Sequence, residues 1–276
     1  MNGLIKQLYA KFQQLFPESL DSMEMTNALR RLINDLDSRR QRRANKAWKA
    51  EGTKCVLDLI HAFPVRYLIA THDWLQENAD KISFLPVDRI IQQSAKQIER
   101  ISRMDSTPPV VAVFELPVYS LPVLDNDTLY LALDTVQDPG NLGTIIRTAD
   151  WFGIRDILCS PETVDAFSPK VVMATMGALA RVRVHYCDLI KMLEDSRNLN
   201  VYGTFLDGND IYLSQLSTGG IVIMGNEGRG VSRPAADRCN CRLKIPSYPK
   251  EQPTSESLNV GSATAIVLSE FRRRQY

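Results

Sequence analysis

From Leu129 to the end of the chain, strand patterns and helix patterns alternate. Short runs rich in β-branched and other apolar residues are each followed by a segment with apolar residues at helical spacing. The predicted strands are 129–133, 156–159, 182–184, 201–205, 221–224 and 243–245, and the predicted helices are 142–152, 169–179, 189–193 and 260–274. Such alternation predicts an α/β fold, with a parallel sheet covered by helices on both faces.

The earlier part of the chain has a different organisation. Residues 25–115 combine strand patterns with helical ones, including a predicted helix over 87–101, and we expect a small α/β domain there. Residues 116–128 are rich in Pro, Asn and Asp and are predicted to be a linker to a second domain over 129–276. Residues 1–24 have apolar residues at helical spacing, which predicts a helical extension; a mitochondrial presequence is the alternative.

Bulk properties narrow the class of protein. Hydrophobic residues make up 44% of the chain, as in globular proteins, and no apolar run is long enough to span a bilayer. The five cysteines are scattered and odd in number, which argues against a disulfide framework and favours a reducing cytoplasm. Neither they nor the three histidines have the spacing of a zinc site or a nucleophilic triad, so we expect no metal.

One basic stretch contrasts with a net charge of only +1. From Arg39 to Lys49 the sequence is RRQRRANKAWK, and it contains no acid. Clusters of this kind bind phosphates by releasing counterions, which indicates a nucleic-acid partner. A solvated helix face explains the stretch equally well.

A polar turn follows the predicted strand 129–133. Its sequence over 138–147 is DPGNLGTIIR. Pro139 and Gly140 favour a tight turn, and Asn141 is suited to cap the helix that follows. Arg147 comes six residues later, where its guanidinium can reach an anion near the helix entrance. An ordinary capped helix with a surface arginine is an equally good interpretation.

Two further turns follow later strands. After 221–224 the sequence GNEGRGVS (225–232) has three glycines in six residues, which permits close approach of the backbone to a ligand. It matches neither a P-loop nor the dinucleotide fingerprint. After 243–245, a polar loop leads to Ser257-Leu-Asn259-Val, where Ser257 or Asn259 can cap the last helix. Because ligands of open α/β sheets bind beyond the carboxyl ends of the strands, the three turns predict one composite site.

The order and content of these turns resemble the three motifs of the SpoU-type RNA ribose methyltransferases, within the SPOUT superfamily. The matching residues are Asn141, Gly143 and Arg147 in the first motif, Gly225, Glu227, Gly230 and Ser232 in the second, and Ile245, Pro246 and Ser257 to Val260 in the third. The resemblance covers residues 129–276. More loosely, Ala50-Glu-Gly-Thr-Lys54 is similar to the small substrate-binding domain often found in this family.

The resemblance implies an activity and an architecture. Members transfer a methyl group from S-adenosylmethionine to a ribose 2′-hydroxyl of tRNA or rRNA. Their catalytic domain contains a deep trefoil knot and usually forms a homodimer. No metal is required, since the methyl group of a sulfonium is already activated.

It also implies which residues form the site. At the reaction centre we expect Arg147, Asn141, Glu227, Ser257 and Asn259; around the cofactor Thr204, Gly203, Gly225, Ile245 and Leu258; and on the RNA Arg39, Arg40, Arg42, Arg43 and Lys46. Arg147 is expected to bind RNA phosphate and stabilise the developing oxyanion, with a role as general base as the alternative. Asn141 is expected to orient the ribose or Arg147, and Glu227 to hold Arg147 by a charge-assisted hydrogen bond. Ser257 and Asn259 are expected to shape their loop and position the nucleotide.

Two other functions compete with this interpretation. A non-catalytic RNA-binding protein can keep the same fold, but the intact polar residues of all three motifs argue against it. A dinucleotide-dependent enzyme acting on a small molecule can also use a doubly wound sheet. The missing Gly-x-Gly-x-x-Gly fingerprint argues against that alternative.

Overall fold

The computed structural model describes residues 25–249 and 255–275, so the helical extension predicted for residues 1–24 lies outside the described residues. The chain divides into two compact units. The first contains the described residues up to Val118 together with Phe167–Ala180, and the second contains Tyr119–Ala166 and the residues from Arg181 onward. Within the described ranges, no helix is long and apolar enough to cross a membrane.

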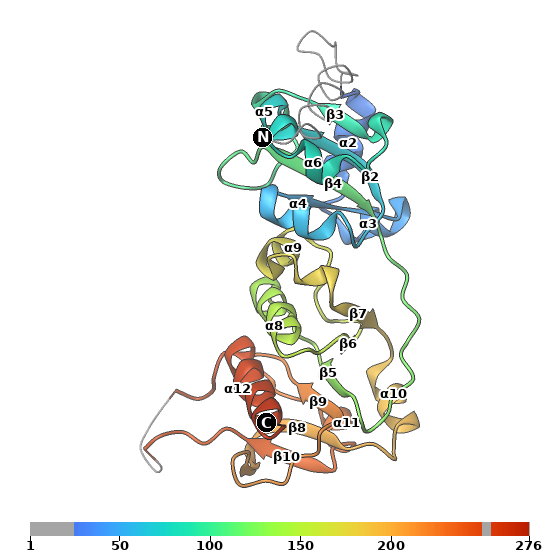
Figure 1. The fold of residues 1–276 in the computed structure, drawn as a ribbon. Helices are drawn as coiled ribbons and strands as arrows, with labels where there is room; N and C mark the ends of the chain where they lie inside the picture. Colours follow the sequence, from blue (N-terminus) through green and yellow to red (C-terminus); the bar gives the residue numbers. More distant parts are fainter. Residues whose placement is uncertain (1–24, 250–254, 276) are drawn as a thin grey trace. The chain divides into compact units, whose positions relative to one another are not determined.

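The described strands of the second unit form one six-stranded sheet (Figure 1). They are β5 (Leu129–Leu133), β6 (Asp156–Cys159), β7 (Arg183–Tyr186), β8 (Val201–Asp210), β9 (Gly220–Met224) and β10 (Cys241–Lys244). The strand order is β10-β8-β9-β5-β6-β7, and every neighbouring pair is parallel. The predicted α/β fold with a parallel sheet is therefore confirmed.

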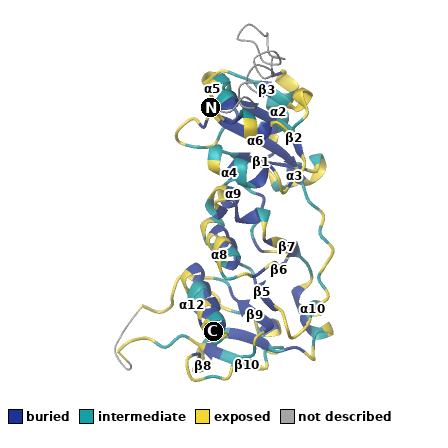
Figure 2. Cartoon of the chain, viewed as in Figure 1, coloured by how far each residue is buried: buried dark blue, intermediate teal, exposed yellow. Residues whose placement is uncertain are grey.

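Helices cover both faces of this sheet. They are α8 (Pro139–Trp151), α10 (Leu189–Asp195), α11 (Arg233–Ala236) and α12 (Val260–Arg273). Side chains of α10 and α11 pack on one face against Tyr130, Ala132, Ile221 and Ile223, which alternate along β5 and β9. Helices α8 and α12 lie on the other side (Figure 1). The core strands are buried along nearly their whole length (Figure 2), as expected of a parallel sheet covered on both faces.

The first unit contains a smaller, mixed sheet. Its strands are β1 (Ala47–Glu51), β2 (Val65–Ala70), β3 (Ile90–Gln92) and β4 (Val110–Glu115), in the order β1-β4-β2-β3. Strand β4 is antiparallel to both neighbours, whereas β2 and β3 are parallel. The helical segments are α2 (Asn27–Asp35), α3 (Arg39–Asn45), α4 (Thr53–Leu59), α5 (His72–Glu77), α6 (Ala79–Ile82), the 3₁₀ turn η1 (Val87–Arg89) and α7 (Ala95–Glu99). The unit therefore contains both helices and strands, while the predicted domain bounds of 25–115 and 129–276 stay predictions.

The predicted helix over 87–101 is wrong. The segment is divided into η1, β3 and α7. Ile90 and Ile91 pair with Leu68 and Ile69 of β2, and Ile91 is buried in the core of the unit. Isoleucine is enriched in strands, and here the strand pairing outweighs the helical spacing of the apolar residues.

A segment from the second half of the chain completes the core of the first unit. Phe167 packs against Trp48 at 4.9 Å and Phe63 at 6.4 Å between ring centroids, and Trp48 stacks on Phe114 at 4.9 Å. Helix α9 (Pro169–Thr175) follows, then the 3₁₀ turn η2 (Ala178–Ala180). The loop between them contains Gly177, where a Cβ atom would lie only 2.5 Å from an Asp58 oxygen. Such close packing requires glycine at this position.

Candidate active site

The helix of the first motif begins earlier than predicted. Helix α8 starts at Pro139, and Asp138 is its N-cap: Asp138 Oδ1 accepts a hydrogen bond of 2.8 Å from the Asn141 amide N–H. The prediction that Asn141 caps this helix is therefore wrong. Proline is favoured at the first helical position, which moves the cap to the residue before it. The Asn141 side chain is consequently free to make a contact outside its own helix.

The second motif folds into a tight hairpin just beyond β9. The Asn226 N–H donates to the Gly230 carbonyl and the Gly230 N–H donates to the Asn226 carbonyl, both over 2.9 Å. A Cβ atom at Gly225 would overlap the Gly230 carbonyl group, and Gly230 has a φ of +69°. Both glycines are thus required by backbone geometry, which places the Glu227 side chain at the tip of the hairpin.

The Asn226 side chain ties this hairpin to the end of β5. Its Oδ1 accepts hydrogen bonds from the amide N–H groups of Gly228 (3.0 Å) and Arg229 (3.1 Å). Its Nδ2 donates to the carbonyl oxygen of Thr135 over 2.8 Å. Thr135 has a φ of +63°, an uncommon conformation for a β-branched residue. Sequence reasoning missed Asn226, although an Asn at the start of a glycine-rich turn is a known signal for side-chain-to-backbone hydrogen bonds.

The third motif caps the last helix through Asn259, one of the two caps predicted. Asn259 Oδ1 accepts from the amide N–H groups of Gly261 (2.9 Å) and Ser262 (3.2 Å) at the start of α12. Since the oxygen faces the helix, the Nδ2 group points the other way and donates to Asn141 Oδ1 over 2.8 Å. Asn141 Nδ2 in turn donates to Glu227 Oε1 over 3.0 Å. The structure therefore joins one residue of each motif in a single directed chain of hydrogen bonds, which we call the amide relay.

Arg147 is not part of the amide relay. The predicted hydrogen bond between Glu227 and Arg147 is absent, and Glu227 Oε1 accepts a hydrogen bond from Asn141 instead. Six helical residues turn through about 600°, so Arg147 lies roughly 120° around the axis of α8 from Asn141. Its side chain is exposed, and among the described residues it forms no hydrogen bond or ion pair. The guanidinium is therefore available to an anionic ligand.

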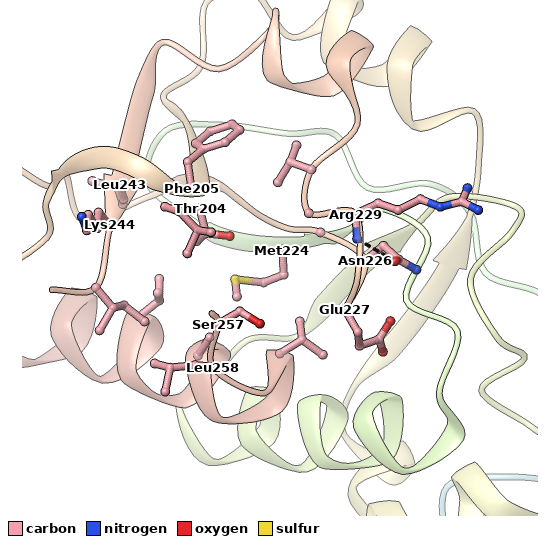
Figure 3. A pocket seen from close by; sticks show the side chains of 18 of the residues that line it. Thr204, Phe205, Met224, Asn226, Glu227, Arg229, Leu243, Lys244, Ser257 and Leu258 are labelled. Carbon is pink, nitrogen blue, oxygen red and sulfur yellow. Dashed lines mark hydrogen bonds between the residues drawn. The ribbon is translucent and has the colours of Figure 1, made fainter. Parts of the chain in front are cut away.

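A cavity of about 430 Å³ lies beyond the carboxyl ends of β8, β9 and β10 (Figure 3). Of the residues predicted around the cofactor, Thr204, Gly225, Ile245 and Leu258 line it. Gly203 does not: a Cβ there would overlap the Phe205 ring and lie 2.5 Å from Cys239 Sγ, so its position is one of close packing. Of the residues predicted at the reaction centre, Glu227 and Ser257 line the same cavity. Asn141 and Asn259 are not among its lining residues but are connected to Glu227 through the amide relay, and Arg147 does not line it.

One wall of the cavity results from an irregularity in β8. In the pairing of β10 with β8, Arg242 lies opposite Gly203, whereas the next residue, Leu243, lies opposite Asn209. Residues 204–208 of β8 therefore have no partner residue in β10. The Thr204 hydroxyl donates to the Ile223 carbonyl over 3.1 Å, which holds the start of this excursion. The Arg242 guanidinium lies 3.6 Å from the centroid of the Phe205 ring and supports it from behind.

The lining suits a nucleoside with a positively charged tail. Phe205, Met224 and Leu243 supply apolar surface for a base. Charged side chains of both signs line the cavity: the carboxylates of Glu227 and Glu256 favour a sulfonium or an ammonium group, and the cations of Arg229 and Lys244 favour a carboxylate. A volume of about 430 Å³ falls within the range of pockets that hold cofactor-sized ligands. S-adenosylmethionine has these features, so the residues fit this cofactor.

No cysteine or histidine is among the residues found to line the cavity within the described chain. All five cysteines are free thiols, and burial raises the pKa of Cys55 and of Cys239 to about 12. His185 is buried and bonded to Asp156 over 2.7 Å. Searching the described residues reveals no cluster of three His, Cys, Asp or Glu side chains arranged to hold a metal ion.

The basic run is divided between a helix and a strand. Arg39 to Asn45 form α3, whereas Ala47 to Lys49 belong to β1. Arg40, Arg43 and Lys46 are exposed, and Arg39 is half-buried. Folding adds Arg66 to this face, because its guanidinium donates to the carbonyls of Asn45 (2.8 Å) and Lys46 (3.2 Å). We call Arg40, Arg43, Lys46 and Arg66 the basic patch.

Arg42, predicted to bind RNA, has a different role. It is only 2% exposed, and its NH1 donates to the carbonyl oxygens of Leu36 (2.7 Å) and Asp37 (2.9 Å). Lys49 is also buried, where it donates to the Ile101 carbonyl and pairs with Asp37 at 3.0 Å. These two cations hold the first unit together and are not accessible to a phosphate. Arg42 meets carbonyls of the turn that precedes α3, and Lys49 lies on β1, so both contacts depend on the fold around the basic run.

The chain is similar to known RNA methyltransferases in sequence and in structure. The model of the SpoU rRNA Methylase family matches residues 128–269. The 23S rRNA (guanosine(2553)-2′-O)-methyltransferase RlmP of Bacillus subtilis is 31% identical over 175 residues, which cover 62% of this chain and 68% of that protein. The solved structure of a protein assigned to the TrmH family of RNA methyltransferases, from Porphyromonas gingivalis, is 38% identical with a TM-score of 0.81, covering 90% of this chain and 98% of that one. An AdoMet-bound rRNA methyltransferase from Sinorhizobium meliloti is 30% identical with a TM-score of 0.79, covering 92% and 97%.

Proposed function

The chain belongs to the SpoU rRNA Methylase family, and from this premise we propose that its cavity and amide relay methylate a ribose 2′-hydroxyl of rRNA or tRNA. The reaction is S-adenosylmethionine-dependent methyl transfer to RNA. One observation carries the assignment of the site: Asn259 donates to Asn141 and Asn141 donates to Glu227, so hydrogen bonds join three distant motifs to a carboxylate that lines the cavity.

The cofactor is proposed to lie against the ends of β8, β9 and β10. S-adenosylmethionine supplies a methyl group that is already activated by the sulfonium charge. Thr204 and the backbone around Gly225, Ile245 and Leu258 would hold its nucleoside part. Holding two reactants in line can lower a barrier by several kcal/mol, on the order of 7 to 11, so positioning is a main task of these residues.

Arg147 is proposed to anchor the RNA next to the reacting ribose. Its exposed guanidinium carries five N–H donors in a planar fork, which matches a phosphate group. Placed there, it would also stabilise negative charge developing on the ribose oxygen. The alternative role as general base is less favoured, because guanidinium keeps its proton under nearly all protein conditions.

The basic patch is proposed to bind RNA through the first unit. Arg40, Arg43 and Lys46 are exposed, and their charges are not matched by acids within the run. Phosphate contacts of this kind give affinity and orientation without reading sequence. Since rRNA and tRNA are assembled and used in the cytoplasm, we place the enzyme there.

The homodimer and the trefoil knot stay predictions. Trp151, at the end of α8, is 86% exposed, which is unusual for an aromatic side chain of this size and supports a contact with a second copy. Light scattering of the full chain would measure the oligomeric state, and Trp151→Glu should lower it if α8 forms the contact.

The proposed activity is tested by mapping 2′-O-methyl groups on rRNA and tRNA from cells with and without the gene. We expect at least one ribose to lose its methyl group, and the wild-type gene to restore it. Arg147→Ala should fail to restore it, whereas Arg155→Ala, which removes another exposed arginine of the same unit, should succeed. A protein that binds S-adenosylmethionine but methylates no RNA would contradict the proposal.

A further inference from the structure

Glu227 is held in place through one of its two carboxylate oxygens. Oε1 accepts the hydrogen bond from Asn141 over 3.0 Å. Within residues 25–249 and 255–275, no other hydrogen bond or ion pair to this carboxylate is formed, and the side chain is exposed at the edge of the cavity. Oε2 is thus an oriented acceptor that faces no protein donor.

We propose that Glu227 is the proton acceptor of the reaction, taking the proton of the ribose 2′-hydroxyl on Oε2. This inference rests on the proposed function and assigns Glu227 a catalytic role in place of the expected one of holding Arg147. It also separates two tasks: Glu227 removes the proton, and Arg147 binds the phosphate and stabilises charge.

The direction of the amide relay supports this assignment. The first N–H groups of α12, at the positive end of its dipole, fix Asn259 Oδ1. Asn259 then donates to Asn141, and Asn141 donates to Glu227, so every hydrogen bond points toward the carboxylate. Donors aligned in this way stabilise a negative charge, and a chain of such bonds reinforces itself. The relay therefore fixes the orientation of the carboxylate through Oε1 and leaves Oε2 without a donor from the described residues.

The other groups near the cavity are poorer acceptors. The Arg147 guanidinium has donors only. Ser257 has a hydroxyl group, which is itself a weak acid. Glu256 also lines the cavity, but in the described part of the chain no hydrogen bond orients its carboxylate. Glu227 is the acid that combines access to the cavity with a fixed orientation.

The proposed step balances in atoms and charge. The O–H bond of the ribose hydroxyl breaks and its proton passes to Glu227 Oε2. The electron pair of the ribose oxygen forms the new bond to the methyl carbon, while the carbon–sulfur bond of the donor breaks and leaves its electron pair on sulfur. One carboxylate and one sulfonium become a neutral acid and a neutral thioether. Glu227 then releases the proton to water.

The test is the pH dependence of methyl transfer in a single turnover, with enzyme and S-adenosylmethionine in excess over RNA. Carboxylates are ionised throughout the range from about pH 6 to pH 9. We therefore expect a wild-type rate that is flat across this range. Glu227→Gln keeps an oxygen for the Asn141 amide but cannot serve as the base. Its rate should fall by about 10²- to 10⁴-fold near neutral pH and rise with pH as hydroxide replaces the carboxylate.

Glu162→Gln is the matched control, since Glu162 is an exposed acid in the loop after β6 and lies outside the cavity. It should keep the wild-type rate and profile. A second readout is the affinity of Glu227→Gln for S-adenosylmethionine, measured by calorimetry, and for RNA, measured by filter binding. RNA affinity should match wild type, and affinity for S-adenosylmethionine should change far less than the rate, because the inference assigns Glu227 to the chemical step.

Two results would overturn the inference. One is a Glu227→Gln enzyme with the wild-type rate. The other is a slow variant with a flat profile and equally weakened binding, which would make Glu227 a binding residue. Both differ from failure of the proposed function, in which the wild-type enzyme itself methylates no RNA.

Discussion

The side chains of Asn141 and Glu227, 86 residues apart in the sequence, are joined by a hydrogen bond of 3.0 Å. Asn141 is the middle member of the amide relay and also accepts the hydrogen bond from Asn259. Removing its amide therefore separates the carboxylate from the cap of α12. The consequence should be seen in the rate of methyl transfer more than in cofactor binding.

We expect Asn141→Ala to lower the single-turnover rate by about 10²- to 10³-fold, the usual cost of losing one preorganised donor at a reaction centre. Asn141→Asp should be at least as slow, because it cannot donate and places a second carboxylate beside Glu227. Single-turnover kinetics and calorimetry with S-adenosylmethionine provide the measurements. Wild-type rates in Asn141→Ala would show that the relay has no part in the reaction.

Asn226 is predicted to determine the shape of the second motif. Asn226→Ala removes two acceptor contacts and one donor contact, so we expect the hairpin to loosen and cofactor affinity to fall, with a cost of about 1 to 3 kcal/mol. Asn226→Asp keeps the acceptor for Gly228 and Arg229 but removes the donor to Thr135. It should give an intermediate affinity in calorimetry. Equal affinities for all three proteins would argue that the hairpin holds its shape without this side chain.

Neighbouring arginines of α3 should behave in opposite ways. Reversing the charge of the basic patch with Arg43→Glu and Lys46→Glu should weaken RNA binding and make it less dependent on salt. The slope of the logarithm of the binding constant against the logarithm of the salt concentration should fall by about one for each phosphate that is no longer neutralised. Arg42→Ala should leave the salt dependence unchanged. Instead it should lower the free energy of unfolding by about 2 to 4 kcal/mol, since two carbonyl oxygens lose a buried charged donor. Filter binding at several salt concentrations and urea unfolding separate the two effects.

Local sequence patterns predicted most of the second unit. Strands β5 to β10 and helices α8 and α12 lie close to where alternating apolar runs indicated, because the central strands β5, β6 and β9 are fully buried and each helix has one apolar face. The prediction of a helix over 87–101 was wrong because β3 forms by pairing with β2. Such a pairing joins residues that are distant in the sequence, and no local pattern indicates it. The cation Arg42 was misjudged for a related reason: burial of one arginine within a run depends on the loop that folds over it.

The membership of the site was predictable, but its hydrogen-bond pattern was not. The order of the three motifs, together with the family resemblance, was sufficient to assign them to one edge of the sheet. Which side chains meet there depends on rotation about helix axes and on the direction in which each amide points. Asn259 faces Asn141 only because its oxygen is already used by the start of α12, and Glu227 meets Asn141 instead of Arg147 for reasons of helix phase.

The final prediction concerns the pH dependence of stability and rests on Glu270, near the end of α12. Glu270 is 4% exposed and accepts hydrogen bonds from Arg273 (2.8 and 2.9 Å) and from Arg274 (2.8 Å). The pKa of Glu270 is lowered from its ordinary value of 4.5 to about 2. The hydrogen bonds from Arg273 have the largest effect on this pKa, burial raises it, and the hydrogen bond from Arg274 lowers it further. Arg274 also donates to the Ile211 carbonyl, which connects this cluster to the loop after β8.

A depressed folded-state pKa means that the carboxylate stabilises the fold above pH 4.5, where it is ionised in both states. That stabilisation is lost as pH falls from 4.5 toward 2, because the unfolded chain takes up the proton first. Glu270→Gln should therefore be less stable than wild type in urea unfolding at pH 7, and the difference should shrink below pH 4.5. Asp207→Asn, which breaks the exposed pair with Arg242, is the control and should have little effect on the free energy of unfolding at any pH. A difference for Glu270→Gln that stays constant from pH 7 to pH 3 would show that packing of the side chain, and not its charge, stabilises the end of α12.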